Sequence, residues 1–252
     1  MRAPMALKAV LFDVGDTLWH SAEAPPAAEF RRIAAERART FLRAEGFECP
    51  DPGRIARTAW DALESAMKHA RATDRREPDY AEIARRAIAG LGLQLDRGQA
   101  GALIEAIYVS GEDGGKAAYP GARVTLESLH DRGFMLGIVT NRAFGGARFR
   151  DDLLAAGFDV PWATCVVSVE AGYLKPHPAI FERALSDLGI AGSEAAMVGN
   201  SLLEDVAGAQ ALGISAAWKR SIPDAEGVVP DFTFDDLPEL LDWAPLKVAA
   251  NG

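Results

Sequence analysis

The sequence predicts an α/β protein whose doubly wound parallel sheet is interrupted by an inserted all-helical domain. From residue 113 onward, apolar runs of strand length alternate with helical patterns, as they do in βαβ units. Another strand-like run, Ala9–Phe12, lies near the N-terminus, whereas the residues from 20 to 112 carry helical periodicity without strand signals. The first strand is therefore expected to join the later strands in one sheet that helices cover on both faces. This predicts a core of residues 1–19 and 113–252 and a helical domain of residues 20–112.

The first predicted strand ends on a carboxylate. Asp13 follows the apolar run directly, and Gly15, which tolerates tight backbone conformations, comes two residues later. Ligands of open α/β sheets gather at the carboxyl ends of the strands, so Asp13 is a candidate functional residue. Taken alone, the stretch is equally compatible with a strand that ends in an ordinary turn.

Four helical patterns are expected in the segment 20–112. Pro52 opens the second of them, and Asp96 is the expected N-cap of the fourth. The apolar positions are Phe30, Ile33 and Phe41 in the first pattern, Ile55, Ala59, Leu63 and Met67 in the second, Tyr80, Ile83 and Ala87 in the third, and Leu103, Ile104 and Ile107 in the fourth. These stripes indicate the core of a small bundle, with a ligand-lining role as the alternative. The stretch 110–115, rich in glycine and charge, is the expected linker.

Strands and helices alternate in the second half of the chain. Strands are expected at residues 134–140, 164–167, 195–198, 214–218 and 231–234. Helices are expected at residues 121–132, 147–156, 178–188, 203–212 and 235–243, the last with Asp235 as its cap. Glycines 133, 157, 189 and 213 lie where four of these helices should end. Pro178 lies where the third should begin.

Composition excludes several classes of partner. Lys+Arg 27 against Asp+Glu 36 gives a net charge of −9, which argues against nucleic acids and acidic membranes as partners. No apolar run is long enough for a signal peptide or a membrane span. Cys49 and Cys165 fit no metal-binding or redox spacing, and the four histidines do not cluster. A protein with reduced cysteines in the cytoplasm is expected.

Four stretches at predicted strand ends together resemble the motifs of the haloacid dehalogenase-like (HAD) hydrolase superfamily. They are Phe-Asp-Val-Gly-Asp-Thr-Leu (12–18), Ile-Val-Thr-Asn (138–141), Gly-Tyr-Leu-Lys-Pro-His-Pro (172–178) and Val-Gly-Asn-Ser-Leu-Leu-Glu-Asp-Val-Ala-Gly-Ala (198–209). Each is innocuous alone, but their order and spacing over almost the whole chain are those of the family. The resemblance implies a Rossmann-like core, and it makes the segment 20–112 a helical cap domain.

The resemblance also implies roles for individual residues. Asp13 would be the nucleophile that forms an aspartyl-phosphate, and Lys175 would balance the charge of the anions around it. Thr140 and the backbone N–H of Asn141 would bind phosphoryl oxygens. A Mg²⁺ ion would bridge Asp13 and the phosphoryl group, as expected of a hard cation with oxygen ligands. Its predicted ligands are Asp13, the Gly15 carbonyl, Asn200 and Asp205.

Two departures from the family pattern affect these roles. The family's phosphatases carry a second aspartate, the general acid, where this chain has Gly15, and Asp16 occupies the usual glycine position. Asp16 remains open as a substitute acid. Asn200 replaces the first acid of the fourth motif, so Asp205 is expected to be the main acidic metal ligand, with Glu204 in reserve. An uncharged amide ligand should lower metal affinity.

The expected function is Mg²⁺-dependent hydrolysis of a small phosphorylated metabolite. The alternatives are 2-haloacid dehalogenation, or a weakly active or inactive relative that binds a phosphorylated ligand or a protein partner. A phosphonate hydrolase would need a cap lysine for a Schiff base. Lys68 is the one lysine in the segment 20–112 and is interpreted as a solvated surface residue.

Overall fold

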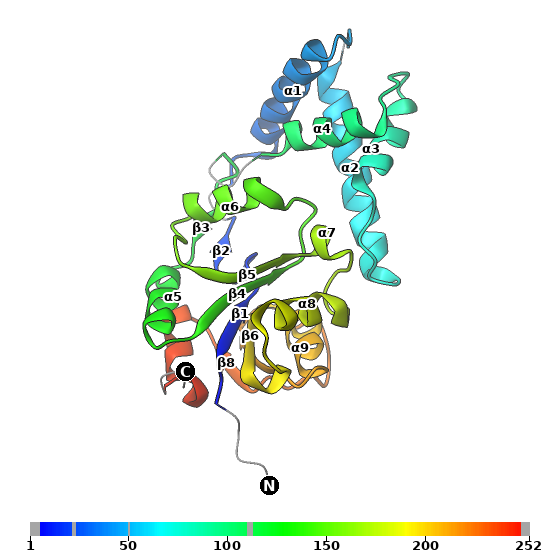
Figure 1. The fold of residues 1–252 in the computed structure, drawn as a ribbon. Helices are drawn as coiled ribbons and strands as arrows, with labels where there is room; N and C mark the ends of the chain where they lie inside the picture. The colour runs from blue at the N-terminus through cyan, green and yellow to red at the C-terminus, as the bar shows by residue number, and fades with distance from the viewer. Residues whose placement is uncertain (1–5, 22–23, 50, 110–112, 248–252) are drawn as a thin grey trace. The chain divides into compact units, whose positions relative to one another are not determined.

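The computed structural model describes residues 6–21, 24–49, 51–109 and 113–247. Within these residues, six strands form one sheet in the order β5-β4-β1-β6-β7-β8, and every neighbouring pair is parallel. The strands are β1 (Ala9–Phe12), β4 (Met135–Thr140), β5 (Trp162–Val167), β6 (Ala195–Gly199), β7 (Ser215–Lys219) and β8 (Phe232–Phe234). Figure 1 shows this sheet with helices on both faces. The predicted doubly wound α/β fold is confirmed.

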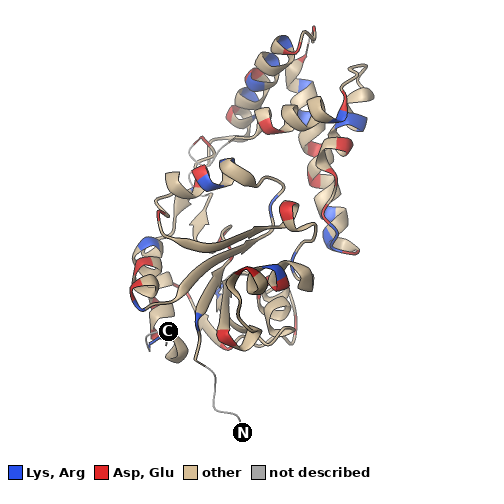
Figure 2. Ribbon diagram, in the orientation of Figure 1, with Lys and Arg blue, Asp and Glu red and all other residues tan. Residues whose placement is uncertain are grey.

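Strand β1 lies near the middle of the sheet because its four side chains are all apolar. Phe12 pairs in register with Ile138 of β4 on one side and with Val198 of β6 on the other. All four β1 residues have no measurable exposure, as expected for a strand buried on both faces. Figure 2 shows the strands almost entirely without charged residues. The carboxyl ends of β1, β4 and β6 therefore lie side by side at one edge of the sheet.

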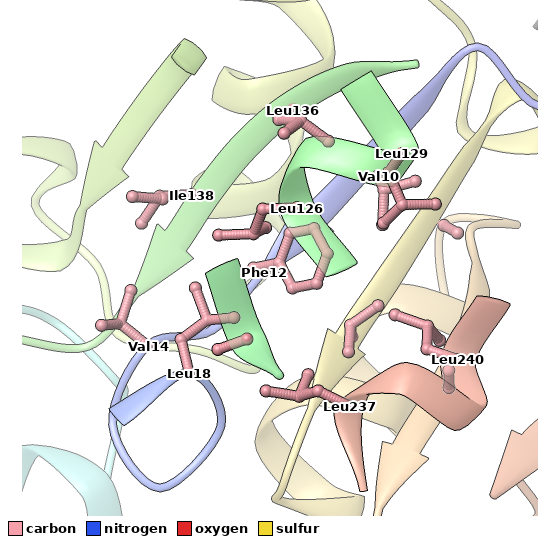
Figure 3. Close-up of a cluster of buried hydrophobic side chains, with 14 of the residues drawn as sticks. Val10, Phe12, Val14, Leu18, Leu126, Leu129, Leu136, Ile138, Leu237 and Leu240 are labelled. Carbon is pink, nitrogen blue, oxygen red and sulfur yellow. The ribbon is translucent and has the colours of Figure 1, made fainter. Parts of the chain in front are cut away.

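One face of the sheet packs against α5 (Ala122–Asp131), α6 (Gly146–Ala155) and the 3₁₀ helix η3 (Leu237–Asp242). Figure 3 shows Val10 and Phe12 of β1 close to Leu126 of α5 and to Leu237 and Leu240 of η3. Burying an aliphatic or aromatic side chain of this size contributes about 1.5–3 kcal/mol each. Phe12 of β1 faces this cluster. Because successive residues of a strand alternate between its two faces, the side chain of Asp13 is directed away from the cluster.

The other face packs against α8 (Pro178–Leu188), η2 (Leu202–Ala207) and α9 (Gly208–Gln210). Leu11 and Met197 from the strands pack in one cluster with Ile180 and Phe181 from α8. The segment η2 is a π-helix rather than the expected α-helix, and such turns occur frequently at functional sites. The helix predicted over residues 203–212 is thus replaced by a π-turn followed by a short α-helix.

The described residues within 1–21 and 117–252 form one compact unit, and those within 22–116 form a second. The second unit is helical: α1 (Ala27–Ala44), α2 (Pro52–Ala72), α3 (Tyr80–Ala89) and α4 (Arg97–Ile107). Asp51, Asp79 and Asp96 each accept a backbone N–H at the start of α2, α3 and α4, contacts typically worth about 1 kcal/mol each. The role of the unit as a cap, with the predicted boundaries at residues 19/20 and 112/113, stays a prediction.

Other elements differ from the sequence-based expectation. A two-residue antiparallel pair joins β2 (Trp19–His20) to β3 (Ala117–Ala118), and a short helix α7 covers Ser168–Ala171. Both are too short to give a periodic signal. The last helix is a 3₁₀ segment that follows Asp236 rather than Asp235, because Pro238 favours the first helical positions.

Two further expectations concern the ends and the linker. Residues 110–112 of the expected linker, and residues 1–5, lie outside the described part of the chain. Across the described residues, none of the helices combines the length and the apolar character needed to cross a membrane. Location in the cytoplasm stays a prediction.

Candidate active site at the carboxyl ends of the central strands

The sheet order brings three motifs together around Asp13. Asp13 follows β1, Thr140 is the last residue of β4, and Lys175 lies in the loop before α8. Thr140 Oγ1 donates to Asp13 Oδ1 at 3.0 Å, and Lys175 Nζ donates to the same oxygen at 2.7 Å. All three residues are buried, with exposed fractions of 8%, 2% and 1% for Asp13, Thr140 and Lys175. Groups that lie up to 162 positions apart in the sequence thus converge on one carboxylate.

Lys175 is a buried cation held by three acceptors. Besides Asp13, its Nζ donates to Asp205 Oδ1 at 2.7 Å and to the carbonyl of Val139 at 2.8 Å. Burial alone would lower the pKa of Lys175, but the adjacent carboxylates of Asp13 and Asp205 outweigh it and raise the pKa. The ammonium group is therefore charged at neutral pH. Its three N–H donors are all satisfied, as a buried charge requires.

Asp205 is held on the other side of this ammonium group. Its Oδ2 accepts the backbone N–H of Ser201 at 2.9 Å, so both of its oxygens are hydrogen bonded. Burial raises the pKa of Asp205 to about 6, with Lys175 acting in the opposite direction. Gly199 permits this approach, because a Cβ atom there would lie 2.2 Å from Cγ of Asp205. Glycine in the Val-Gly-Asn stretch is thus required by the position of the carboxylate.

Thr17 is a site residue to which the sequence analysis gave no role. Its side chain is fully buried, and its Oγ1 lies 3.2 Å from Asp13 Oδ2 and 3.3 Å from Asn200 Oδ1. One hydroxyl hydrogen serves two acceptor oxygens, so the carboxylate of Asp13 and the amide oxygen of Asn200 face a common point. The signal was present, since Thr17 belongs to the first motif, but the sequence does not show its partner 183 positions away.

The side chain of Asn141 links the second motif to the third and fourth. Its Oδ1 accepts the backbone N–H of Lys175 at 2.7 Å, and its Nδ2 donates to Glu204 Oε2 at 3.0 Å. From the sequence alone, only the backbone N–H of Asn141 is expected to take part in binding, and Glu204 is expected as a reserve metal ligand. The structure shows Glu204 hydrogen bonded to this amide.

The turn after Asp13 has an unusual distribution of backbone angles. Asp16 has φ +56°, in the left-handed region where glycine is favoured. Gly15 lies outside that region, and a Cβ atom there would meet nothing within 4 Å. The Asp16 side chain is exposed, while its carbonyl accepts a hydrogen bond of 3.2 Å from Lys219 Nζ. Burial lowers the pKa of Lys219, partly offset by the charge of Asp16.

The oxygen donors at this edge are compatible with a magnesium ion. No three His, Cys, Asp or Glu side chains gather as a metal site within the described residues. Asp13 Oδ2 and Asn200 Oδ1 nevertheless converge on Thr17, and the Gly15 carbonyl belongs to the same turn. One carboxylate with neutral oxygens suits Mg²⁺, which usually keeps several waters and completes its shell with substrate phosphate.

Phosphatases of known name are similar to this chain in sequence. A phosphoserine phosphatase of Thermus thermophilus is 36% identical over 124 residues, which are 48% of this chain and 49% of that protein. This chain thus spans about half the length of that relative. A glyceraldehyde 3-phosphate phosphatase of Methanopyrus kandleri is 29% identical over 245 residues, covering 94% of this chain and 96% of that protein.

A similar structure and a family model extend the likeness along the chain. The 2-haloacid dehalogenase of Pseudomonas syringae pv. Tomato superposes with a TM-score of 0.62 at 25% identity, covering 94% of this chain and 97% of that one. The model of the haloacid dehalogenase-like hydrolases matches residues 7–213, which include all four motifs. The chain therefore belongs to the haloacid dehalogenase-like hydrolase family.

Proposed function

We propose that this chain hydrolyses the phosphate monoester of a small metabolite through an aspartyl-phosphate on Asp13. The observation that carries the proposal is the contact of Asp13 Oδ1 with both Lys175 Nζ and Thr140 Oγ1 at the end of β1. A buried carboxylate that fixed donors hold in one orientation is positioned to attack the phosphorus of a bound substrate. The cation beside it reduces the repulsion between an anionic nucleophile and an anionic substrate.

The chemistry follows in two displacements. A carboxylate oxygen of Asp13 attacks phosphorus, the ester P–O bond breaks, and the leaving alkoxide takes a proton. Water then attacks the phosphorus of the acyl phosphate, releasing inorganic phosphate and restoring the carboxylate. Lys175 and Thr140, which lie against Asp13, balance the negative charge that accumulates on the transferred group.

Protonation of the leaving group is where this chain departs from the family. Gly15 supplies no side chain, and Asp16 carries its carboxylate on a left-handed residue with an exposed side chain. The proton is therefore assigned to solvent or to Asp16. Turnover should be slow for basic leaving groups, since general acid catalysis typically contributes about 10²–10⁴-fold.

Mg²⁺ is part of the proposal. Asp13, the Gly15 carbonyl and Asn200 would hold it, and its chemistry is to neutralise charge on the phosphoryl oxygens. Asp205 stays a predicted ligand, although both of its oxygens are hydrogen bonded to Lys175 and Ser201. Because Asn200 contributes an uncharged amide oxygen in place of a carboxylate, the affinity for Mg²⁺ is expected to be low.

The substrate class rests on the relatives and on charge. The relatives are named for phosphoserine and for glyceraldehyde 3-phosphate, both small phosphorylated metabolites. The net charge of −9 disfavours nucleic acid as a partner. A small phosphorylated metabolite is therefore the proposed substrate.

The test is phosphate release from p-nitrophenyl phosphate with and without Mg²⁺, followed by a panel of small phosphorylated metabolites. An aspartyl-phosphate can be trapped with borohydride, which reduces the acyl phosphate and converts the aspartate to homoserine. Peptide mass spectrometry should then find homoserine at position 13. Metal-dependent phosphate release without any modification at position 13 would contradict the proposed intermediate.

Dehalogenation of a 2-haloacid is the second candidate. It needs no acid for its leaving group, because a halide departs unprotonated, and this agrees with Gly15. Similarity to the Pseudomonas dehalogenase is the other observation that favours it. Chloride release from a 2-chloro acid without added metal would identify this reaction. The absence of both products would point to the third possibility, an inactive relative that binds a ligand or partner.

A further inference from the structure

The side-chain amide of Asn141 is fixed in one orientation by two neighbouring loops. Its Oδ1 accepts the N–H of Lys175 at 2.7 Å, and its Nδ2 donates to the carbonyl of Lys175 at 3.3 Å and to Glu204 Oε2 at 3.0 Å. An amide turned over by half a rotation would set donor against donor and amide oxygen against carboxylate. The negative charge of Glu204 therefore favours the same orientation as the main-chain groups of Lys175 and strengthens the hold of Asn141 on both of them.

Glu204 and Asp205, adjacent residues of η2, act on opposite ends of Lys175. Asp205 Oδ1 accepts from the ammonium group at 2.7 Å. Glu204 is linked through Asn141 to the N–H and C=O of the same residue. The start of η2 is itself restrained, because Ser201 Oγ accepts the backbone N–H of Glu204 at 2.8 Å. The short turn η2 thus restrains both the backbone and the ammonium group of Lys175.

We propose that Glu204 is a positioning residue for Lys175, acting through the Asn141 amide rather than as a metal ligand. The inference rests on the proposed function, which gives Lys175 its charge-balancing role. Lys175 belongs to a loop, so its backbone needs restraints beyond those on its ammonium group. The Asn141 amide supplies two of them, and the Glu204 carboxylate stabilises the amide in the orientation that does so.

Two substitutions of Glu204 test whether an acceptor oxygen for Asn141 Nδ2 is needed at this position. Glu204→Ala removes the acceptor and should lower kcat about tenfold, a typical loss for residues that orient a functional group. Glu204→Gln keeps an oxygen that can accept from Asn141 Nδ2, so it should stay within about threefold of the wild type. KM and the Mg²⁺ concentration for half-maximal rate should be unchanged in both. The matched control is Glu182→Ala, an exposed glutamate of α8, which should change nothing.

An exchange of the two groups provides the decisive experiment. Asn141→Asp sets a carboxylate against Glu204 and should lower kcat at least about tenfold through the repulsion of like charges. Adding Glu204→Gln to Asn141→Asp restores a hydrogen bond in the opposite direction, because the amide N–H of the new glutamine can donate to the carboxylate of the new aspartate. The double variant should therefore have a higher kcat than Asn141→Asp alone. A purely structural role of Glu204 predicts no such rescue. Unchanged kcat in Glu204→Ala, failure of the rescue, or a changed Mg²⁺ requirement would overturn the inference.

Failure of the proposed function is recognised separately. If the wild type releases no phosphate from any ester, that function is wrong, and the contact is then judged by urea unfolding. Glu204→Ala should destabilise the wild type but have little further effect in an Asn141→Ala background, because the two residues share one interaction. Additive losses of stability would overturn the inference whatever reaction the protein catalyses.

Discussion

Lys175 Nζ lies 2.7 Å from Oδ1 of Asp13 and pairs the predicted nucleophile with a buried cation 162 positions away in the sequence. The same nitrogen lies 2.7 Å from Asp205 Oδ1, so one positive charge is shared by two carboxylates. Before substrate binds, the three groups together carry one net negative charge. A phosphoryl group adds further negative charge, which is the electrostatic reason for including a divalent cation in the proposed function.

Asp13→Asn should abolish turnover and leave the fold intact. The amide has nearly the shape of the carboxylate, but it is a far weaker nucleophile. Steady-state hydrolysis of p-nitrophenyl phosphate should fall below about a tenth of the wild-type rate, with the far-UV circular dichroism unchanged. Asp242→Asn, which alters a surface aspartate paired with Lys247, is the control. Retention of more activity than this would eliminate Asp13 as the nucleophile.

Lys175→Met should reduce both activity and stability at neutral pH. Loss of a fixed electrostatic contact should lower kcat about 10²–10³-fold. Breaking a buried ion pair leaves unpaired carboxylates and typically costs about 3–5 kcal/mol in free energy of unfolding. A wild-type rate in this variant would show that the Lys-Pro-His-Pro stretch is simply the start of α8.

The stability cost of Lys175→Met should depend on pH in a defined direction. Burial raises the pKa of Asp205 to about 6 in the wild type. A carboxyl with a raised pKa contributes to stability below its unfolded pKa of about 3.9, and this contribution is lost as the pH rises through the folded pKa. Removing the cation raises that pKa further. Urea unfolding should therefore show a smaller difference between variant and wild type at pH 5 than at pH 8, and a difference independent of pH would contradict the ion pair.

Gly15→Asp with Asp16→Gly tests the missing general acid. Gly15 is outside the left-handed region with open space beside it, and Asp16 has φ +56°, so each new residue suits its position. Hydrolysis of alkyl phosphates, whose leaving groups are basic, should rise, whereas that of aryl phosphates should change little. Asp16→Gly alone is the matched control and should affect backbone strain without this selectivity. A folded double variant with no gain on alkyl phosphates would mean that proton donation does not limit the reaction.

Gly199→Ala should disrupt the site by displacing the Asp205 carboxylate that accepts from Lys175. The added Cβ would lie 2.2 Å from Cγ of Asp205, so either the carboxylate or the β6 backbone must shift. Forced overpacking of this kind typically costs about 1–3 kcal/mol, and thermal unfolding should show the loss together with reduced turnover. Gly101→Ala in α4 is the control, because its Cβ would make ordinary contact with Ala81. That change should stabilise the helix by up to about 1 kcal/mol.

The sequence contained enough to predict the sheet and the helices around it. The run Ala9–Phe12 and the later apolar runs predict buried strands, and Gly133, Gly157, Gly189 and Gly213 mark helix ends because only glycine readily takes the left-handed angles found there. The segment 202–210 was predicted less well, since a π-turn has no periodicity of its own. The β2–β3 pair was missed because two residues per strand carry no pattern.

The sequence by itself determined which residues are candidates for chemistry. Asp13, Thr140, Asn141, Lys175 and Asp205 lie in four motifs that follow one another in the order of a known family, and local patterns are enough to identify those motifs. Their partners are a different matter. Thr17 faces Asn200, and Glu204 faces Asn141, across separations of 183 and 63 positions. Only the strand order β4-β1-β6 decides those contacts, because hydrogen bonds depend on distances in space that no local periodicity encodes.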